Sequence, residues 1–351
     1  MPVTAPERAE GPAPTAAEPE QPARIAYRDL LAALMPGDAR LVCLDSDTGL
    51  FTGTDFGAAA ERYINLGIAE QNLMGVAAAM ARDGRIPFVN TMATFASSRA
   101  VEAVKLDIAL NDVPVRIVAT HAGLSAGHLG STHHCLEDLA ALRVLPNMTV
   151  LVPADAAQAR ELIRQSVDLP GPVYVRLGRH ATPALAADGP PPVLGRAQLL
   201  RTGDDLLIVA TGPYPVRLAL DAAGELAERG VTASVLNVHT IKPFDAPALL
   251  SAAAGTRGIV TVEEHWRSGG LGSLVAETVS DSADPVRVRR IGVGDHFVSG
   301  NGDQRHLLEQ AGVTKEAILA AAAQLTEPAR QGPRPRGSER RGHKLQGGSA
   351  R

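Results

Sequence analysis

Residues 63–75 of this chain are Tyr63-Ile64-Asn65-Leu66-Gly67-Ile68-Ala69-Glu70-Gln71-Asn72-Leu73-Met74-Gly75. They place one carboxylate, that of Glu70, near the start of an apolar helix that we expect over residues 68–82. Burial of a carboxyl group favours its protonated form, so an acid at this position can share a proton with a ligand. The alternative is an ordinary acid at a helix N-terminus, where the helix dipole stabilises a negative charge.

Outward from this helix, short β-rich runs alternate with Ala-rich helical runs. This alternation is typical of parallel sheets covered by helices on both faces. We therefore predict an α/β fold of two doubly wound domains with mostly parallel sheets. In the first domain we expect strands at residues 41–44, 115–120, 149–152 and 172–177, and a second helix at 156–166. In the second domain we expect strands at 206–210, 231–237, 258–262 and 286–291, and helices at 216–229, 246–253, 271–280 and 315–325.

The local composition divides the chain into five parts. Residues 1–24 are rich in Ala, Pro and Glu and are expected to form a disordered tail. Residues 25–180 form the expected first domain, and a linker rich in Pro and Gly follows at 181–195. Residues 196–326 form the expected second domain, and residues 327–351 form a basic tail that we also expect to be disordered.

The overall composition restricts the class of protein. With 351 residues the chain is long enough for about two domains. A formal net charge of −4 argues against a nucleic-acid-binding protein. The sequence has no apolar run long enough to span a bilayer, which argues against a membrane partner. Cys43 and Cys135 are too few for a disulfide framework and fit a reducing compartment, so we expect a cytoplasmic location.

A loop rich in His and Gly follows the strand expected at residues 115–120. Open α/β sheets place their sites at the carboxyl ends of strands, so this loop is a candidate binding site. A metal site made by His128, His133, His134 and Cys135 is the less favoured interpretation. Adjacent residues rarely point toward one ion, and no second pair of ligands has metal-binding spacing. We therefore expect no metal ligand in this chain.

Residues 67–72, Gly-Ile-Ala-Glu-Gln-Asn, closely resemble a motif of the transketolase family, and the resemblance extends over residues 40–325. It implies that the cofactor is thiamine diphosphate and that Glu70 is a catalytic residue in contact with the aminopyrimidine ring. For an isolated acid the helix-dipole interpretation would be preferred. The long match on both sides of Glu70 favours the catalytic role.

Three further residues are implied to lie beside the cofactor. Asp47 follows the first strand and is similar to an acidic residue in the cofactor-binding loop of the family. Phe95 matches the position of an aromatic ring that stacks on the aminopyrimidine, although it could also be an ordinary core residue. Met92 is found where many transketolases carry an aromatic residue, so the resemblance implies a looser pyrimidine pocket.

The resemblance also implies substrate-binding residues. His121 and His133 match histidines that contact the substrate, where they can bind hydroxyl groups or help to neutralise an oxyanion, so both are implied to be catalytic. His128 is also expected to bind the substrate. Arg179 aligns with an arginine that binds the distal phosphate of sugar phosphates, and its planar guanidinium suits two parallel phosphate contacts. The alternative for Arg179 is an exposed ion pair with a surface carboxylate.

At His128 and Leu129 the chain departs from the family. Common transketolases carry an acidic Glu-Asp pair there, and the Asp binds the C2 hydroxyl of the sugar. Leu129 cannot accept that hydrogen bond. A site that binds a hydroxyl discriminates strongly for it, so the loss of the acceptor relaxes or redirects specificity. We therefore expect a substrate other than a standard pentose phosphate.

The resemblance covers only the C-terminal half of a transketolase, its pyrimidine-binding and C-terminal domains. The missing diphosphate-binding domain is marked by Gly-Asp-Gly, which this sequence lacks. The chain thus resembles the C-terminal one of the two subunits of a split transketolase. An N-terminal transketolase subunit would bind the diphosphate and would supply most of the ligands of Mg²⁺. We expect a heterotetramer that is active only when both subunits are present.

The activity implied is transfer of a two-carbon ketol unit from a ketose, expected to be phosphorylated, to an aldehyde acceptor. A deoxyxylulose-phosphate-synthase-like enzyme and a 2-oxoacid dehydrogenase E1 β-like subunit stay open as alternatives. A non-catalytic stabilising subunit is the third possibility. Residues 239–245 and 263–272 of the second domain also resemble family motifs, and we expect them to complete a sheet and to pack subunits.

Overall fold

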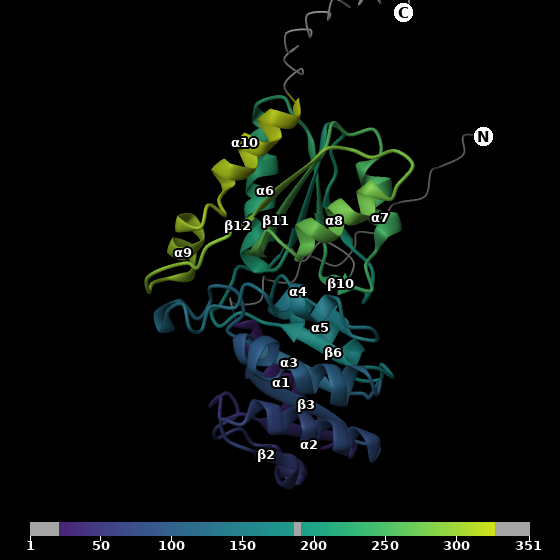
Figure 1. Cartoon of the computed structure of the whole chain (residues 1–351), viewed down its shortest axis with the longest axis vertical. Coiled ribbons are helices and arrows are strands. Elements are labelled where there is room, and N and C mark those ends of the chain that lie inside the picture. Colours follow the sequence, from purple (N-terminus) through teal and green to yellow (C-terminus); the bar gives the residue numbers. More distant parts are fainter. Residues whose placement is uncertain (1–20, 186–190, 327–351) are drawn as a thin grey trace, which may run out of the picture.

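The computed structural model describes residues 21–185 and 191–326. Most of the two expected tails, and residues 186–190 of the expected linker, lie outside the described residues. Figure 1 shows two domains stacked along the long axis of the molecule, with the N-terminal domain below. The fold class predicted from the sequence is confirmed, because both domains are α/β units with mostly parallel sheets.

The first domain is built on a seven-stranded sheet with the order β10-β5-β6-β4-β3-β1-β2. Its strands are β1 (Leu41–Asp45), β2 (Tyr63–Asn65), β3 (Ile86–Met92), β4 (Arg116–Thr120), β5 (Thr149–Leu151), β6 (Val173–Arg176) and β10 (Thr240–Lys242). All pairs are parallel except β10 with β5. Every residue of β1 and β4 is buried, as expected for central strands covered on both faces.

Helices cover both faces of this sheet. They are α1 (Ala23–Leu34), α2 (Glu70–Arg82), α3 (Val101–Ala103), α4 (Asp138–Arg143) and α5 (Ala156–Ser166), with short 3-10 and π-helical turns η1 (Gly57–Arg62), η2 (Phe95–Arg99), η3 (Val104–Ala109) and η4 (Gly127–Leu129). Helices α1 and α5 pack together on one face, and α2 and α3 pack on the other. The doubly wound arrangement brings the loops that follow the strands to one edge of the sheet.

Two of the differences between the first domain and the sequence prediction have a clear physical reason. Helix α1 begins at Ala23, so the end of the stretch expected as a tail is folded. The reason is a helical spacing of apolar residues that extends into this stretch, since Ala23, Tyr27 and Leu31 are all buried. Strand β3 was not among the expected strands. It contains Pro87, which weakens a strand pattern because proline rarely occurs inside a sheet.

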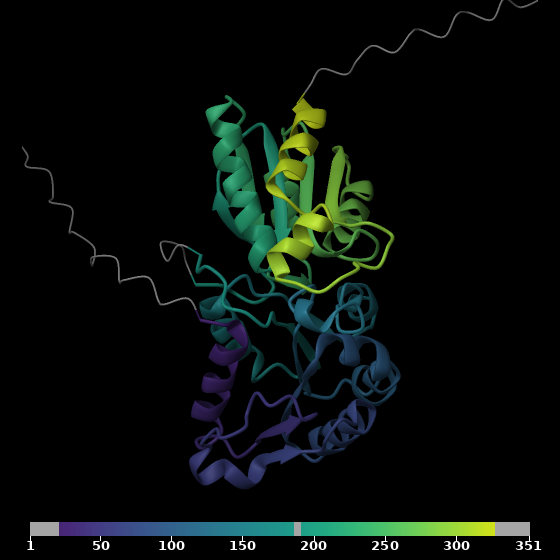
Figure 2. The same ribbon diagram turned by 90° about the vertical axis from the view of Figure 1, so that its left-hand side faces the viewer.

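The second domain has a five-stranded sheet with the order β12-β11-β8-β9-β7. Its strands are β7 (Gln198–Arg201), β8 (Leu206–Thr211), β9 (Ala233–Asn237), β11 (Ile259–Trp266) and β12 (Val288–Val293). Its helices are α6 (Pro213–Glu228), α7 (Ala246–Ala253), α8 (Leu271–Ser280), α9 (Gln304–Gln310) and α10 (Lys315–Thr326). Figures 1 and 2 show α6 beside α10 on one face of the sheet, with α7 and α8 on the other.

Strand β10 joins the two domains. It follows β9 in the chain, yet it pairs with β5 of the first sheet, with Thr240 opposite Leu151 and Lys242 opposite Val150. The backbone N–H of Val152 also donates to the carbonyl oxygen of His239 (2.8 Å). The expectation that residues 239–245 complete a sheet is therefore confirmed, and the sheet is that of the other domain.

A buried ion pair lies close to the contact between the domains. The Nε–H of Arg176, in β6, donates to Oδ2 of Asp138 at the start of α4 (2.7 Å). The hydroxyl of Tyr174 donates to the same oxygen (2.8 Å). Both ionic side chains are almost inaccessible to solvent, with 6% of the Arg176 side chain and none of the Asp138 side chain exposed.

None of the helices in the described part of the chain combines the length and apolar character needed to cross a membrane.

This ion pair leads to a prediction about stability. Asp138→Asn removes the carboxylate that pairs directly with the buried guanidinium of Arg176, so we expect a loss of about 3–5 kcal/mol in the free energy of unfolding. Asp168→Asn is the matched control. Asp168 pairs with Arg40 on the surface, where such pairs contribute about 1 kcal/mol or less. Urea denaturation followed by circular dichroism measures both values. Equal losses in the two variants would contradict the prediction.

Candidate active site

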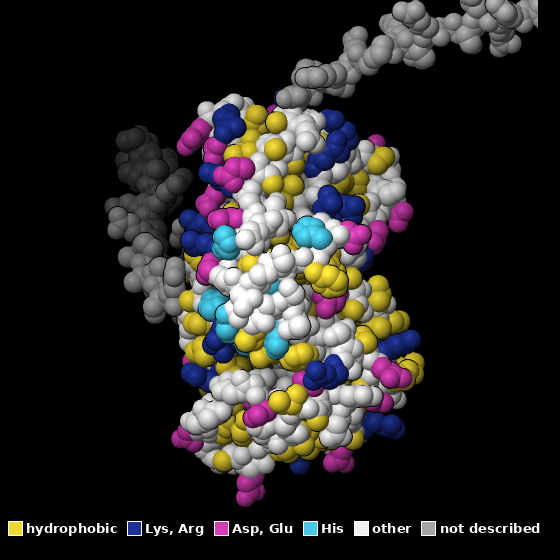
Figure 3. All heavy atoms as spheres, turned by 60° about the vertical axis from the view of Figure 1, so that its left-hand side comes forward, with side chains coloured by type: hydrophobic (Ala, Val, Ile, Leu, Met, Phe, Trp, Pro, Cys, Tyr) yellow, Lys and Arg dark blue, Asp and Glu magenta, His cyan; other side chains and the backbone are white. Residues whose placement is uncertain are grey.

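The predicted site residues gather at the carboxyl edge of the first sheet. Asp47 follows β1, Met92 ends β3 and His121 follows β4. Phe95 lies in η2, and Arg179 follows β6 by three residues. Figure 3 shows histidine side chains gathered on one face of the molecule near the junction of the domains, beside Lys or Arg side chains. The candidate site therefore lies where the first domain meets the second.

Glu70 is the first residue of α2, and only 1% of its surface is exposed. The buried Leu73 and Met74 supply apolar surroundings. Ile68, which lies inside the helix expected over residues 68–82, is 73% exposed, because α2 begins two residues later than predicted. One oxygen of the Glu70 carboxylate, Oε2, accepts a hydrogen bond from Nη1 of Arg99 (2.9 Å). The carboxylate is thus buried but remains within reach of a polar group at the edge of the site.

The sequence analysis did not identify Arg99. Its guanidinium contacts Glu70 and also lies over the ring of Phe95, with Cζ 4.6 Å from the ring centroid. The side chain is half exposed. The sequence could have indicated this residue, because Arg99 is the one charged residue in the Ala- and Ser-rich stretch at residues 96–100 that follows Phe95. The π-helical turn η2 places both side chains on one side of the chain.

The guanidinium of Arg99 lies between Glu70 and Phe95, and its contacts show what kind of group these two residues can hold. A guanidinium is a planar group that carries N–H donors. This group contacts the carboxylate of Glu70 and the ring face of Phe95 at once. An aminopyrimidine is also planar and carries N–H donors, so the two residues fit such a ring. Met92 is half-buried at the end of β3, close to Phe95 in the chain.

Two of the predicted site residues have left-handed backbone conformations, which are uncommon for residues other than glycine. Asp47 has φ 64° and His121 has φ 59°. Asp47 is exposed, and its Oδ1 accepts from Nδ2 of Asn65 (3.0 Å). The neighbouring Asp45 is buried instead and accepts from the N–H and the hydroxyl of Thr48, so it closes the turn. Asp47 is therefore the acid of this loop that is accessible to a ligand.

His121 is buried, and its Nδ1 lies 2.9 Å from the hydroxyl oxygen of Thr120. Burial, reinforced by the positive charges of Arg24 and Arg179, lowers the pKa of His121 to about 3. The imidazole is thus neutral at neutral pH. A neutral imidazole has one N–H donor and one acceptor, so it can bind a hydroxyl group without carrying charge.

A cationic cluster surrounds His121. Nη1 of Arg179 lies 2.6 Å from both ring nitrogens of His128, and Nε–H of Arg24 donates to the carbonyl oxygen of Arg179 (2.8 Å). His180 lies near enough to lower the pKa of His121 further. Arg24 was missed because the sequence analysis assigned it to the N-terminal tail. Two arginines and two histidines make this corner of the site suitable for an anion.

The remaining predicted residues lie in the loop that follows β4. The ring of His133 contacts the ring of Phe95 edge to face, with centroids 5.5 Å apart. Leu129 is 39% exposed and presents an apolar side chain at the surface. Cys135 is buried and pairs through its backbone with Gly123, away from the surface. Within residues 21–185 and 191–326, no three His, Cys, Asp or Glu side chains are arranged to hold a metal ion.

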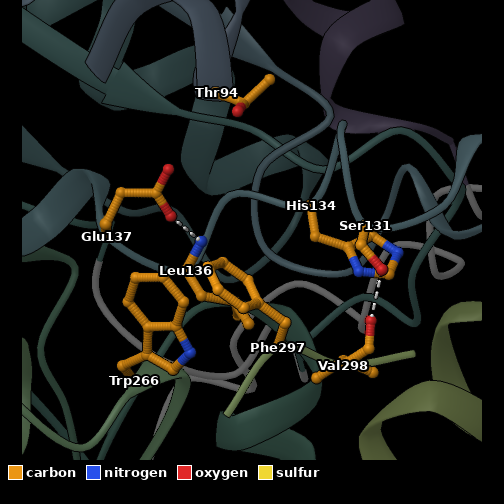
Figure 4. Close-up of a pocket in the computed structure, with 8 residues that line it drawn as sticks. All are labelled: Thr94, Ser131, His134, Leu136, Glu137, Trp266, Phe297 and Val298. Carbon is orange, nitrogen blue, oxygen red and sulfur yellow. Dashed lines mark hydrogen bonds between the residues drawn. The ribbon is translucent and has the colours of Figure 1, made fainter. Parts of the chain in front are cut away.

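A small cavity of about 100 Å³ lies between the domains beside this loop (Figure 4). The hydroxyl of Ser131 donates to the carbonyl oxygen of Val298 across it (2.7 Å), as the dashed line in Figure 4 marks. The exposed ring of Phe297 packs edge to face on Trp266 at its rim (5.8 Å between centroids). Its lining residues are Thr94, Ser131, His134, Leu136, Glu137, Trp266, Phe297 and Val298. Residues of the second domain thus form part of the wall behind the candidate site.

The low pKa of His121 leads to a prediction about titration. In the isolated chain we expect His121 to stay neutral between about pH 5 and pH 8, where an ordinary histidine titrates. Arg24→Gln removes a nearby positive charge and should raise the pKa of His121. Arg28→Gln, on the same helix, is the control. Long-range ¹H–¹⁵N spectra report the protonation state, and His121→Asn identifies the signal. A midpoint near 6.5 for His121 in the unchanged chain would contradict the prediction.

Comparisons with known proteins identify both domains of this chain. Residues 20–184 match the family model of the transketolase pyrimidine-binding domain, and residues 195–318 match that of the transketolase C-terminal domain. A solved structure described as a split-gene transketolase, an inactive β4 tetramer, superposes with a TM-score of 0.79 at 42% sequence identity. The match covers 87% of this chain and 98% of that one.

Curated relatives of similar length are transketolase subunits. The 6-deoxy-6-sulfo-D-fructose transketolase subunit SqwH of Clostridium sp. (strain MSTE9) is 41% identical over 87% of this chain and 94% of its own length. An apulose-4-phosphate transketolase subunit of Phocaeicola vulgatus is 39% identical over 87% of this chain and 97% of its own. A 1-deoxy-D-xylulose-5-phosphate synthase of Gloeobacter violaceus is 37% identical over 88% of this chain but only 49% of its own length. The chain therefore belongs to the transketolase family, whose members depend on thiamine diphosphate, and corresponds to the C-terminal half of a complete transketolase.

Proposed function

We propose that this chain is the C-terminal subunit of a split transketolase, which transfers a two-carbon ketol unit from a ketose to an aldehyde acceptor. The observation that carries the proposal is the environment of Glu70. Its carboxylate is buried at the start of α2, and a planar group that carries N–H donors bridges it to the ring of Phe95. That arrangement suits an aminopyrimidine ring.

The proposed cofactor is thiamine diphosphate. When bound, it supplies the carbon nucleophile and the electron sink that ketol transfer requires. Glu70 would hold a proton at the pyrimidine ring nitrogen, and Phe95 and Met92 would line that ring. Asp47 would lie beside it. His121, neutral because of its burial, would bind a hydroxyl or carbonyl oxygen of the substrate together with His133.

The substrate is proposed to carry an anionic group. Arg24, Arg179 and His128 form one cluster at the edge of the site, and a phosphate or another anion suits their donors. The relatives described above are named for a sulfonated ketose and for a sugar phosphate. Leu129 offers no acceptor for a sugar hydroxyl, which supports a substrate other than a standard pentose phosphate.

An N-terminal subunit is the proposed partner. It would carry the diphosphate-binding domain and most of the Mg²⁺ coordination, and the assembly would be a heterotetramer. The similar structure of a β4 tetramer is described as inactive, which supports the view that a subunit of this kind needs its partner. We keep the prediction of a cytoplasmic location on the basis of the two free, buried cysteines, Cys43 and Cys135.

One alternative keeps the cofactor but changes the reaction. The match to half of a 1-deoxy-D-xylulose-5-phosphate synthase shows that the same two domains are found in such enzymes. The subunit-length relatives favour the transketolase. A 2-oxoacid dehydrogenase E1 β-like subunit and a non-catalytic stabilising subunit are two further candidates, and activity measurements on the assembled pair distinguish them.

The proposal predicts activity only from the assembled pair. We would co-express this chain with an N-terminal transketolase subunit that contains Gly-Asp-Gly. The purified pair is then assayed for ketol transfer with thiamine diphosphate and Mg²⁺ over a panel of ketoses and aldehydes. Glu70→Gln should lower kcat by about 10²-fold or more, because general acid–base contributions are of this size. Glu228→Gln, an exposed position on α6, is the control and should keep full activity.

Each contrary result points to a different function. Turnover of pyruvate without ketol transfer would favour the synthase or the dehydrogenase. Full activity in the Glu70→Gln pair would favour a non-catalytic subunit. Ordinary rates with both xylulose 5-phosphate and ribose 5-phosphate would contradict the proposed role of Leu129 while leaving the transketolase assignment intact.

A further inference from the structure

The loop that carries the substrate histidines is held by the other domain. This loop, residues 121–133, follows β4 and includes His121 and His133. Along its length it meets β11 and the segment that follows β12, both of which belong to the second domain. These contacts raise the question of what the second domain contributes to the site.

The strongest of these contacts is made by Glu264 in β11. The carboxylate oxygen Oε1 accepts from the backbone N–H of Leu124 (2.6 Å), three residues after His121. Nε2 of Gln304, the first residue of α9, donates to both carboxylate oxygens (2.9 Å each). Glu264 and Gln304 are 4% and 5% exposed, so these hydrogen bonds are shielded from water. Arg176 of the first domain donates to the backbone oxygen of the same Glu264 (2.9 Å).

Two glycines of the loop allow the second domain to approach this closely. A Cβ atom at Gly123, where φ is 63°, would collide with the Glu264 carboxylate. A Cβ atom at Gly127 would collide with the carbonyl oxygen of Gly302. The backbones are also paired there, since the N–H of Gly302 donates to the carbonyl oxygen of Gly127 (3.1 Å). The loop is therefore shaped around the second domain.

The chemistry of Glu264 suggests more than a contribution to stability. A buried carboxylate is costly to desolvate, and apolar residues of similar size usually stabilise a domain contact at least as well. Unlike an apolar side chain, the carboxylate accepts a directional hydrogen bond, and this bond fixes the position of the backbone N–H of Leu124. His121 has an unfavourable backbone conformation (φ 59°), which persists only where its surroundings hold it. The hydrogen bond at Leu124 lies close to that strained residue.

We propose that Glu264, oriented by Gln304, is a positioning residue of the active site: the second domain holds the loop 121–133 in the conformation in which His121 meets the ketose. This inference rests on the proposed ketol transfer for its effect on kinetics. The effect on the loop itself does not depend on that function. Neither Glu264 nor Gln304 touches the cofactor-binding residues Glu70 and Phe95, so the role is indirect.

Gln304→Met tests the proposal with little change in volume, because methionine replaces the amide by an apolar group of similar length. Gln310→Met, at the exposed end of the same helix α9, is the matched control. In the isolated chain, hydrogen–deuterium exchange of residues 121–133 should become about tenfold faster in Gln304→Met than in the unchanged chain, since the carboxylate that holds the loop loses the hydrogen bonds that orient it. The control should exchange at the original rate.

In the assembled enzyme, Gln304→Met should raise KM for the ketose by about three- to tenfold, with a smaller change in kcat. The KM for the cofactor should not change. Equal exchange rates in the two variants, or equal KM values for the ketose, would overturn the proposal. If the unchanged pair shows no ketol transfer but Gln304→Met still accelerates exchange in the loop, the proposed function fails and the role of Glu264 in holding the loop survives.

Discussion

The guanidinium of Arg176 is the group on which the arrangement of this molecule depends. It lies at the carboxyl end of β6, buried between the domains, and it donates to Asp138, to the backbone oxygen of Cys135 and to that of Glu264. Asp138 begins α4, Cys135 lies two residues beyond the loop 121–133, and Glu264 belongs to the second domain. A buried guanidinium is costly unless its donors are hydrogen-bonded, so these three bonds favour the observed arrangement of the elements. The candidate site lies beside this junction, at the carboxyl edge of the first sheet.

The site is consequently a product of both domains, although every side chain predicted to touch the cofactor or the substrate comes from the first. The parallel sheet brings Asp47, Phe95 and His121 to one edge because the carboxyl ends of its strands share that edge. The second domain adds β10 to the same sheet and holds the loop after β4 from the far side.

The sequence predicted the parts of this account that depend on local pattern. Alternating β-rich and Ala-rich runs predicted the fold, with α5, α7 and α8 at the bounds observed, and the motif around Glu70 indicated a buried acid at a helix start. Contacts between distant residues were not predictable. Arg24, Arg99 and Glu264 each bind a residue that is far away in the sequence. The shortest of these separations, between Arg99 and Glu70, is 29 residues. Arg24 was also hidden by a composition typical of disorder, and strand β3 by its proline.

On the proposed function, this chain holds only the pyrimidine end of a cofactor site. Isothermal titration calorimetry with thiamine diphosphate and Mg²⁺ tests it most directly, using this chain alone, the N-terminal subunit alone and the two together. We expect binding in the micromolar range or tighter for the pair, and at least about 100-fold weaker binding for either subunit alone, because each would contact only part of the cofactor. Tight binding to this chain alone, or equal affinity for the N-terminal subunit and the pair, would contradict it.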